Sequence, residues 1–119
     1  MMNSEKTAAT VEKIAQSAAQ TLLTAQARVT DQFAAGVVVT AGTMEYLIEA
    51  QAAAHLTAKL QTRWNRGGMA AIEEWLEDAA DQLMFDSAPG STSQVQNEME
   101  KAQRKACQDA YKALSRCRA

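Results

Sequence analysis

The stretch that decides the fold most clearly is residues 69–84, which read MAAIEEWLEDAADQLM. Its apolar residues recur at steps of three and four: Met69, Ile72, Leu76, Ala79 and Leu83. This spacing places them on one face of an α-helix. Acidic residues fill the opposite face: Glu73, Glu74, Glu77, Asp78 and Asp81. The segment therefore predicts an amphipathic helix with one buried and one solvated face, and it leaves Trp75 at the edge of the buried stripe.

A second apolar pattern, also with steps of three and four, predicts a long helix over residues 5–35. Its members are Val11, Ile14, Ala18, Leu22, Ala25, Val29 and Phe33. The pattern has an 11-residue repeat, which keeps a stripe on one face of a straight helix. We expect Ser4, Thr7 or Thr10 to cap its start. At about 1.5 Å per residue this helix is about 45 Å long, longer than a domain of this size is wide.

Two more helices are predicted, over residues 44–64 and 93–116. The first ends at two glycines, and we expect Gly67 to form a left-handed cap there. The second begins with Ser93 and Gln96 at capping-box spacing and carries a thin stripe made mostly of alanine. Before residue 44, three consecutive valines between Gly36 and Gly42 disfavour helix. We therefore expect a break or kink near Gly42, with Thr43 as the following N-cap.

The predicted fold is all-α: a small four-helix arrangement with a long N-terminal helix, in a single domain over residues 1–119. Its linker, at about 86–92, contains Pro89 and Gly90 and is rich in turn-forming residues. No run of apolar residues is long enough to cross a membrane, and the first ten residues lack the apolar core of a signal peptide. These features favour a cytoplasmic protein that does not enter a membrane.

Charge is unevenly distributed along the chain. Residues 69–100 hold eight acidic residues and no base, whereas residues 101–119 hold six bases and one acid. The simplest interpretation is an acidic helix packed beside a basic one; the alternative is an acidic segment that meets a basic partner or imitates nucleic acid. The isoelectric point of about 5.4, and Tyr111 as the sole aromatic residue of the basic segment, argue against direct nucleic-acid binding.

Residues able to carry chemistry are few, so we expect no enzyme activity, no cofactor and no metal. His55 is the only histidine, and Cys107 and Cys117 have no partner at metal-ligand spacing. Ten residues of helix would separate the two cysteines by about 15 Å along the axis, beyond disulfide reach. A His–Cys nucleophilic pair stays open because spatial neighbours are not visible in a sequence.

With catalytic residues few, binding to a partner is the function that the sequence favours. Four thin helices leave little interior for large apolar side chains, and Trp and Met are enriched at interfaces. We therefore expect Trp75, Met84 and Phe85 to contribute to a contact with a protein partner, although core packing is the commoner role for each alone. We also expect a homodimer, since a long exposed apolar stripe favours pairing of two copies.

In length, Ala/Gln-rich composition and the long helix over Val11–Phe33, the chain resembles the small helical anti-activators that pseudomonads use against quorum-sensing transcription factors. That resemblance implies a non-catalytic regulator that inhibits a transcription factor by blocking its dimerisation. Two other classes stay open. Ala-rich amphipathic helices of this kind also resemble phasins, which coat storage granules, and the acidic helix would suit a phage-type inhibitor that acts as a decoy.

Overall fold

Three α-helices make up the described part of the computed structural model, which comprises residues 3–84 and 94–118. They are α1 (Ser4–Ala34), α2 (Ala41–Met84) and α3 (Gln94–Ser115), and no strand occurs among the described residues. The prediction of an all-α fold with a long first helix is confirmed. The expected linker at 86–92, Phe85 and the Ser93 cap lie outside the described residues.

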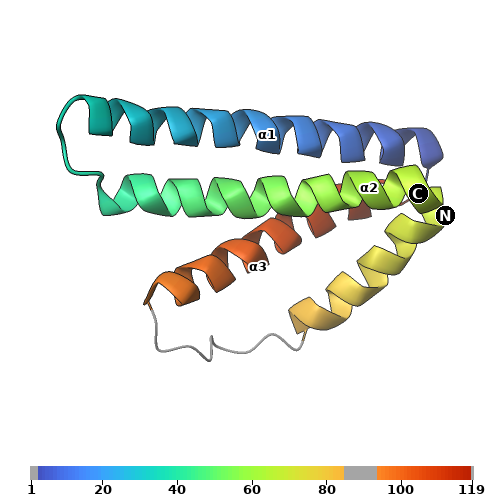
Figure 1. The fold of residues 1–119 in the computed structure, drawn as a ribbon. Helices are drawn as coiled ribbons and strands as arrows, with labels where there is room; N and C mark the ends of the chain where they lie inside the picture. Colours follow the sequence, from blue (N-terminus) through green and yellow to red (C-terminus); the bar gives the residue numbers. More distant parts are fainter. Residues whose placement is uncertain (1–2, 85–93, 119) are drawn as a thin grey trace.

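The predicted count of four helices is wrong, because the two helices expected over residues 44–64 and 69–84 are joined in α2. Gly68 has non-helical angles, φ 59° and ψ −140°, and the chain is helical directly before and directly after it. The result is a bend with no loop between the two arms of α2, residues 41–67 and 69–84 (Figure 1). The left-handed position belongs to Gly68 and not, as expected, to Gly67.

The break between α1 and α2 precedes the expected position near Gly42. Gly36 has a φ of 71° just after α1, and Gly42 already lies within the first turn of α2. Thr40, not Thr43, provides the cap: its Oγ1 accepts a hydrogen bond from the backbone N–H of Thr43 at 3.2 Å. The Nε2 group of Gln32 in turn donates to Oγ1 of Thr43 at 2.9 Å, which ties the end of α1 to the start of α2.

The helices pack so that α2 lies between its two neighbours. Helix α1 runs antiparallel to the first arm of α2, and α3 lies between the two arms, having little contact with α1 (Figure 1). The core forms where the start of α1, the bend of α2 and the end of α3 meet. Its buried members are Val11, Leu60, Ile72, Trp75, Leu76, Ala79, Ala110, Leu114 and Cys117. The other end of the α1–α2 hairpin extends away from this core and makes the molecule elongated, 53 × 30 × 22 Å.

The start of α1 is fixed by Asn3, and not by any of the three caps expected from the sequence, Ser4, Thr7 and Thr10. The Oδ1 atom of Asn3 accepts a hydrogen bond from the backbone N–H of Lys6 at 3.0 Å, and its own N–H donates to the carbonyl of Cys117 at 3.1 Å. Asn3 therefore both caps α1 and joins the two ends of the described chain.

We expect Asn3→Ala to lower the free energy of unfolding by about 1 kcal/mol, since the first-turn N–H loses its side-chain acceptor. Urea denaturation followed by circular dichroism measures this loss. Asn3→Asp retains an acceptor and should remain close to the wild type. Equal stability of the alanine and aspartate variants would show that this cap contributes little.

Candidate functional site

Trp75, Met84 and Phe85, the residues expected at a partner interface, do not lie together on a surface within the described part of the chain. Trp75 lies in the core, with only 9% of its surface exposed. Met84 is the last residue of α2, but its side chain, like the whole of Phe85, lies outside the described part. The interface role of these residues stays a prediction, and the burial of Trp75 favours its alternative role in packing.

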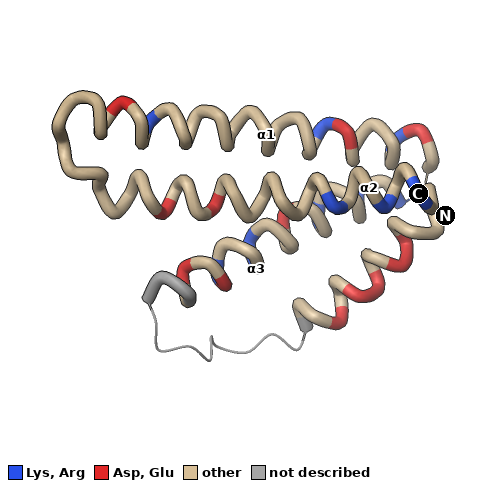
Figure 2. The backbone as a smooth tube through the Cα atoms, viewed as in Figure 1, with Lys and Arg blue, Asp and Glu red and all other residues tan. Residues whose placement is uncertain are grey.

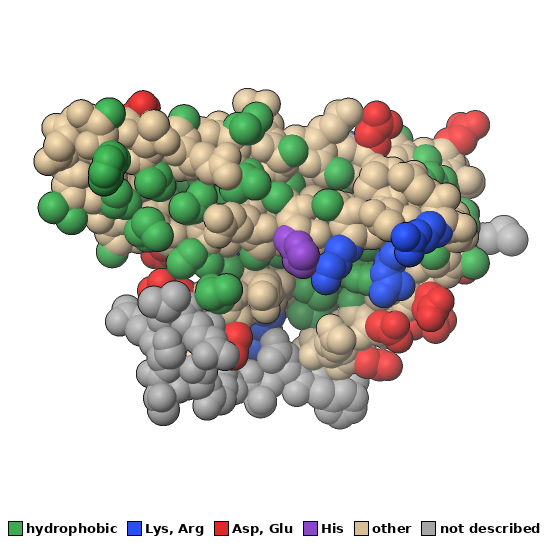
Figure 3. All heavy atoms as spheres, viewed as in Figure 1, with side chains coloured by type: hydrophobic (Ala, Val, Ile, Leu, Met, Phe, Trp, Pro, Cys, Tyr) green, Lys and Arg blue, Asp and Glu red, His purple; other side chains and the backbone are tan. Residues whose placement is uncertain are grey.

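An exposed apolar cluster, here termed the hairpin tip, lies instead where α1 turns into α2. It consists of Phe33 at 80% exposure, Val37 at 55%, Val38 at 86% and Met44 at 41%. Residues 32–44 contain no charged side chain. The space-filling view shows apolar side chains gathered over this end of the hairpin (Figure 3). The tip lies at the opposite end of the hairpin from both termini (Figure 1).

The hairpin tip is exposed because the core ends well before it. Among the described residues, the core and the side chains packed against it reach along α1 only to Ile14. Beyond this point α1 has α2 as its main neighbour, and the pair buries small side chains, Ala18 and Ala25 of α1 and Ala50 of α2. Two polar contacts lie nearer the tip. The guanidinium of Arg28 lies 4.7 Å from the ring centroid of Tyr46, a cation–π distance. This contact and the Gln32–Thr43 hydrogen bond hold the hairpin tip in place. No part of the described chain covers its apolar surface.

The exposed position of this cluster differs from what the apolar pattern predicts. That pattern places Phe33 in the buried stripe of the first helix, and the three valines, Val37–Val39, are predicted only to interrupt the helix. The absence of charge over residues 32–44 is the sequence feature that distinguishes a surface-exposed apolar turn from an ordinary solvated one.

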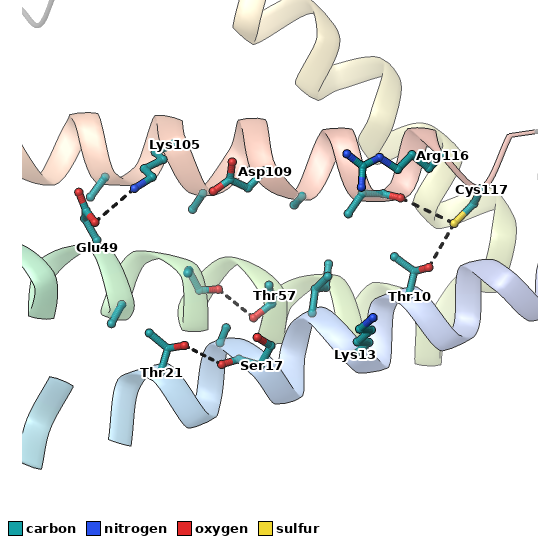
Figure 4. A pocket seen from close by; sticks show the side chains of 18 of the residues that line it. Thr10, Lys13, Ser17, Thr21, Glu49, Thr57, Lys105, Asp109, Arg116 and Cys117 are labelled. Atoms are coloured by element: carbon teal, nitrogen blue, oxygen red, sulfur yellow. Dashed lines mark hydrogen bonds and ion pairs between the residues drawn. The ribbon is translucent and has the colours of Figure 1, made fainter. Parts of the chain in front are cut away.

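A groove between α1 and α3 is the second feature of the surface. It has a volume of about 750 Å³ and is lined by residues of all three helices. Its floor consists mainly of small side chains, among them Ala18, Ala50, Ala106 and Ala110, all of which are buried. Figure 4 shows the groove from close by, with charged side chains at both of its ends.

The charged side chains that line the groove are distributed unevenly. At one end Nζ of Lys105 lies 3.4 Å from Oε2 of Glu49 (Figure 4). Near the other end three cations, Lys6, Lys13 and Arg116, line the groove. This basic end is assembled around the contact between Cys117 and Thr10, whose Sγ and Oγ1 atoms are 3.3 Å apart.

The residues considered for catalysis lie in ordinary environments. His55 is exposed on α2, Cys107 is half-buried and Cys117 is buried, and neither cysteine forms a disulfide. Within residues 3–84 and 94–118, no group of three His, Cys, Asp or Glu side chains is arranged to hold a metal ion. The same residues contain no helix with the length and apolar character needed to span a membrane.

The acidic face predicted for residues 69–84 is confirmed as a solvated face. Its five carboxylates, Glu73, Glu74, Glu77, Asp78 and Asp81, are all exposed. Acidic positions recur along the second arm of α2 (Figure 2). The opposite face of this arm contributes Ile72 and Leu76 to the core, with no exposed surface on either residue. The apolar residues of this segment, spaced by three and four, therefore lie on the buried face, and its acidic residues lie on the exposed face.

No protein-family model, curated protein or solved structure matches this chain.

Proposed function

We propose that this protein is a non-catalytic binding protein that contacts a protein partner through the hairpin tip. The observation that carries the proposal is the exposure of Phe33 and Val38 at the end of an elongated hairpin, 80% and 86% respectively. Contiguous exposed apolar patches are typical of surfaces that bind a partner. Aromatic side chains such as Phe33 are also enriched in the buried centres of interfaces.

The partner that we propose is a transcription factor, and the effect is inhibition of its dimerisation. The basis for this choice is the resemblance in size, composition and first helix to the anti-activators of quorum sensing. A narrow apolar tip on a helical hairpin suits insertion into the groove or helix interface of another protein. We further propose that the protein is a homodimer in the absence of its partner, since pairing of two tips would shield their apolar surface.

A second candidate function is favoured by the same observation. An apolar, uncharged turn could also contact an apolar storage granule, as in the phasin interpretation. The two functions predict different behaviour: a regulator binds one protein and changes its dimer state, whereas a granule coat binds apolar particles without a single protein partner.

The test replaces the two most exposed tip residues in one variant, Phe33→Ser/Val38→Ser. Affinity purification from the native host with mass spectrometry identifies the partner, and titration calorimetry then measures its affinity. We expect binding to weaken about tenfold, the effect of losing about 1.4 kcal/mol of contact energy. The melting temperature should change little, because both side chains are exposed and surface substitutions are usually within about 0.5 kcal/mol.

The matched control is Leu23→Ser, which removes another exposed apolar side chain, 61% accessible, from the same helix but away from the tip. Its affinity should equal that of the wild type. Equal weakening by both variants would mean that contact is not specific to the tip. Recovery of wild-type protein with apolar granules, and no change in the dimer state of any transcription factor, would favour the granule-coating function instead.

A further inference from the structure

From the groove between α1 and α3 we infer a second binding site, one for a single-chain anionic amphiphile such as a long-chain fatty acid. The carboxylate would bind at the basic end of Lys6, Lys13 and Arg116, and the alkyl chain would lie along the alanine floor. This site is separate from the hairpin tip and does not depend on the function proposed for it.

The size of the groove fits a small molecule. Its volume of about 750 Å³ lies within the usual range for ligand sites, about 300–1,000 Å³. The lining residues of α1 extend from Lys6 to Thr21, and those of α3 and the turn that follows it extend from Ala102 to Cys117. Either span corresponds to about 22 Å of helix at about 1.5 Å per residue. The groove is therefore long and narrow, the shape of an extended alkyl chain.

Two hydroxyl groups that line the groove, those of Thr57 and Thr21, already have acceptors within their own helices. Oγ1 of Thr57 donates to the carbonyl of Ala53 at 2.8 Å, and Oγ1 of Thr21 donates to the carbonyl of Ser17 at 3.0 Å (Figure 4). Such bonds to the preceding helical turn satisfy the hydroxyl within its own helix. An alkyl chain laid over these two residues would leave neither hydroxyl newly without a partner.

The basic end supplies the complementary charge. Within the described part of the chain, the side chains of Lys6, Lys13 and Arg116 make no ion pair, whereas Lys105 at the other end is paired with Glu49. Arginine binds a carboxylate through two parallel hydrogen bonds, and lysine can lay its stem on apolar surface while its ammonium group reaches the ligand. Three cations around one end of an apolar groove therefore favour an anionic head group at that end.

Besides Glu49, a second acidic residue, Asp109, lines the groove and limits the orientation of the ligand. It precedes Arg116 by seven residues, which places it about 10 Å away along the axis of α3. Asp109 is exposed, so its carboxylate can remain in water beside a bound chain. The head group must therefore lie at the basic end and not beside Asp109.

The test is a calorimetric titration of the full chain with palmitate, which measures the heat of binding. Palmitate is kept below the concentration at which it forms micelles. We expect one palmitate per chain. Lys13→Ala/Arg116→Ala should weaken binding about tenfold, whereas Lys59→Ala/Arg63→Ala removes two exposed cations that do not line the groove and should leave affinity unchanged. Hexadecyltrimethylammonium, with a similar chain and the opposite charge, should bind at least tenfold more weakly than palmitate.

A second pair of variants tests the path of the alkyl chain. Ser17 is exposed and lines the groove, so Ser17→Leu would place a large side chain in the groove at little risk to folding, while Ser17→Ala would not. We expect only the leucine variant to lose palmitate affinity. Absence of palmitate binding, or binding that neither the cation pair nor Ser17→Leu weakens, would overturn the site. Equal affinity for the cationic amphiphile would also overturn it.

Discussion

Trp75→Ala is expected to lower the free energy of unfolding by about 3–5 kcal/mol, the usual cost of truncating a large aromatic residue in a core. Trp75 is 9% exposed and belongs to the same cluster as Leu60, Leu76 and Leu114, each of which has no exposed surface. Removing the indole would leave a cavity at the point where both arms of α2 meet α3. Urea denaturation followed by circular dichroism measures the loss.

The control for this variant is Glu74→Ala, which alters the neighbouring exposed position and should change stability by less than about 0.5 kcal/mol. The result also decides between the two roles considered for Trp75. A large loss of stability, with unchanged partner affinity of the folded protein, places it in the core. A loss below about 1 kcal/mol together with weaker partner binding would contradict the packing of the indole in the core and make Trp75 an interface anchor.

Local periodicity predicted the elements of this fold well. The first helix was expected over residues 5–35 and extends over Ser4–Ala34. The face of residues 69–84 that was expected to be buried contains Ile72, Leu76 and Ala79, all of them in the core. These predictions succeed because the spacing of apolar residues along a helix is a local property that the sequence contains in full.

The exposed tip could not be predicted in the same way. Periodicity places Phe33 on the same face as Val11, but it does not say how far along that face a neighbouring helix extends. Val11 and Ala25 of the predicted stripe are fully buried, whereas Phe33, at the end of the α1–α2 hairpin, is 80% exposed. The exposure of Phe33 depends on where the α1–α2 hairpin ends and on what packs over that end, which are properties of the tertiary structure.

The groove depends on tertiary structure even more strongly. Its basic end combines Lys6 and Lys13 near one end of the sequence with Arg116 near the other, and no sequence pattern connects them. They meet where the start of α1 and the end of α3 pack together: Val11, Leu114 and Cys117 share one core cluster, and the backbone N–H of Asn3 donates to the carbonyl of Cys117. The groove remains open because α1 and α3 both pack along α2 and make few contacts with each other.

The two glycines at 67 and 68 predict a helix end, and the structure has a bend in α2 at Gly68. The positive φ of Gly68 leads to the second prediction with a large expected effect. Gly68→Ala is expected to lower the free energy of unfolding by about 1–3 kcal/mol, because a residue with a side chain is strained in this region of φ and ψ. No other atom lies within 4 Å of the position of the added Cβ, so the cost comes from the backbone angles and not from a clash.

If α2 straightened to relieve that strain, the protein would lose stability in another way. The second arm would turn away from α3 and expose Ile72 and Leu76, which are fully buried in the bent helix. The variant should therefore also bind more of a fluorescent dye that reports exposed apolar surface. Unfolding in urea, followed by circular dichroism, gives the change in stability.

Gly42→Ala is the matched control, since it makes the same chemical change in the same helix. Gly42 lies in the first turn of α2, does not have a positive φ, and has open space around its added Cβ. Alanine is favoured over glycine in a helix by about 0.5–1 kcal/mol, so this variant should gain stability while Gly68→Ala loses it. If both variants gained stability, α2 would be straight at Gly68, and the position of the second arm against α3 would have to be revised.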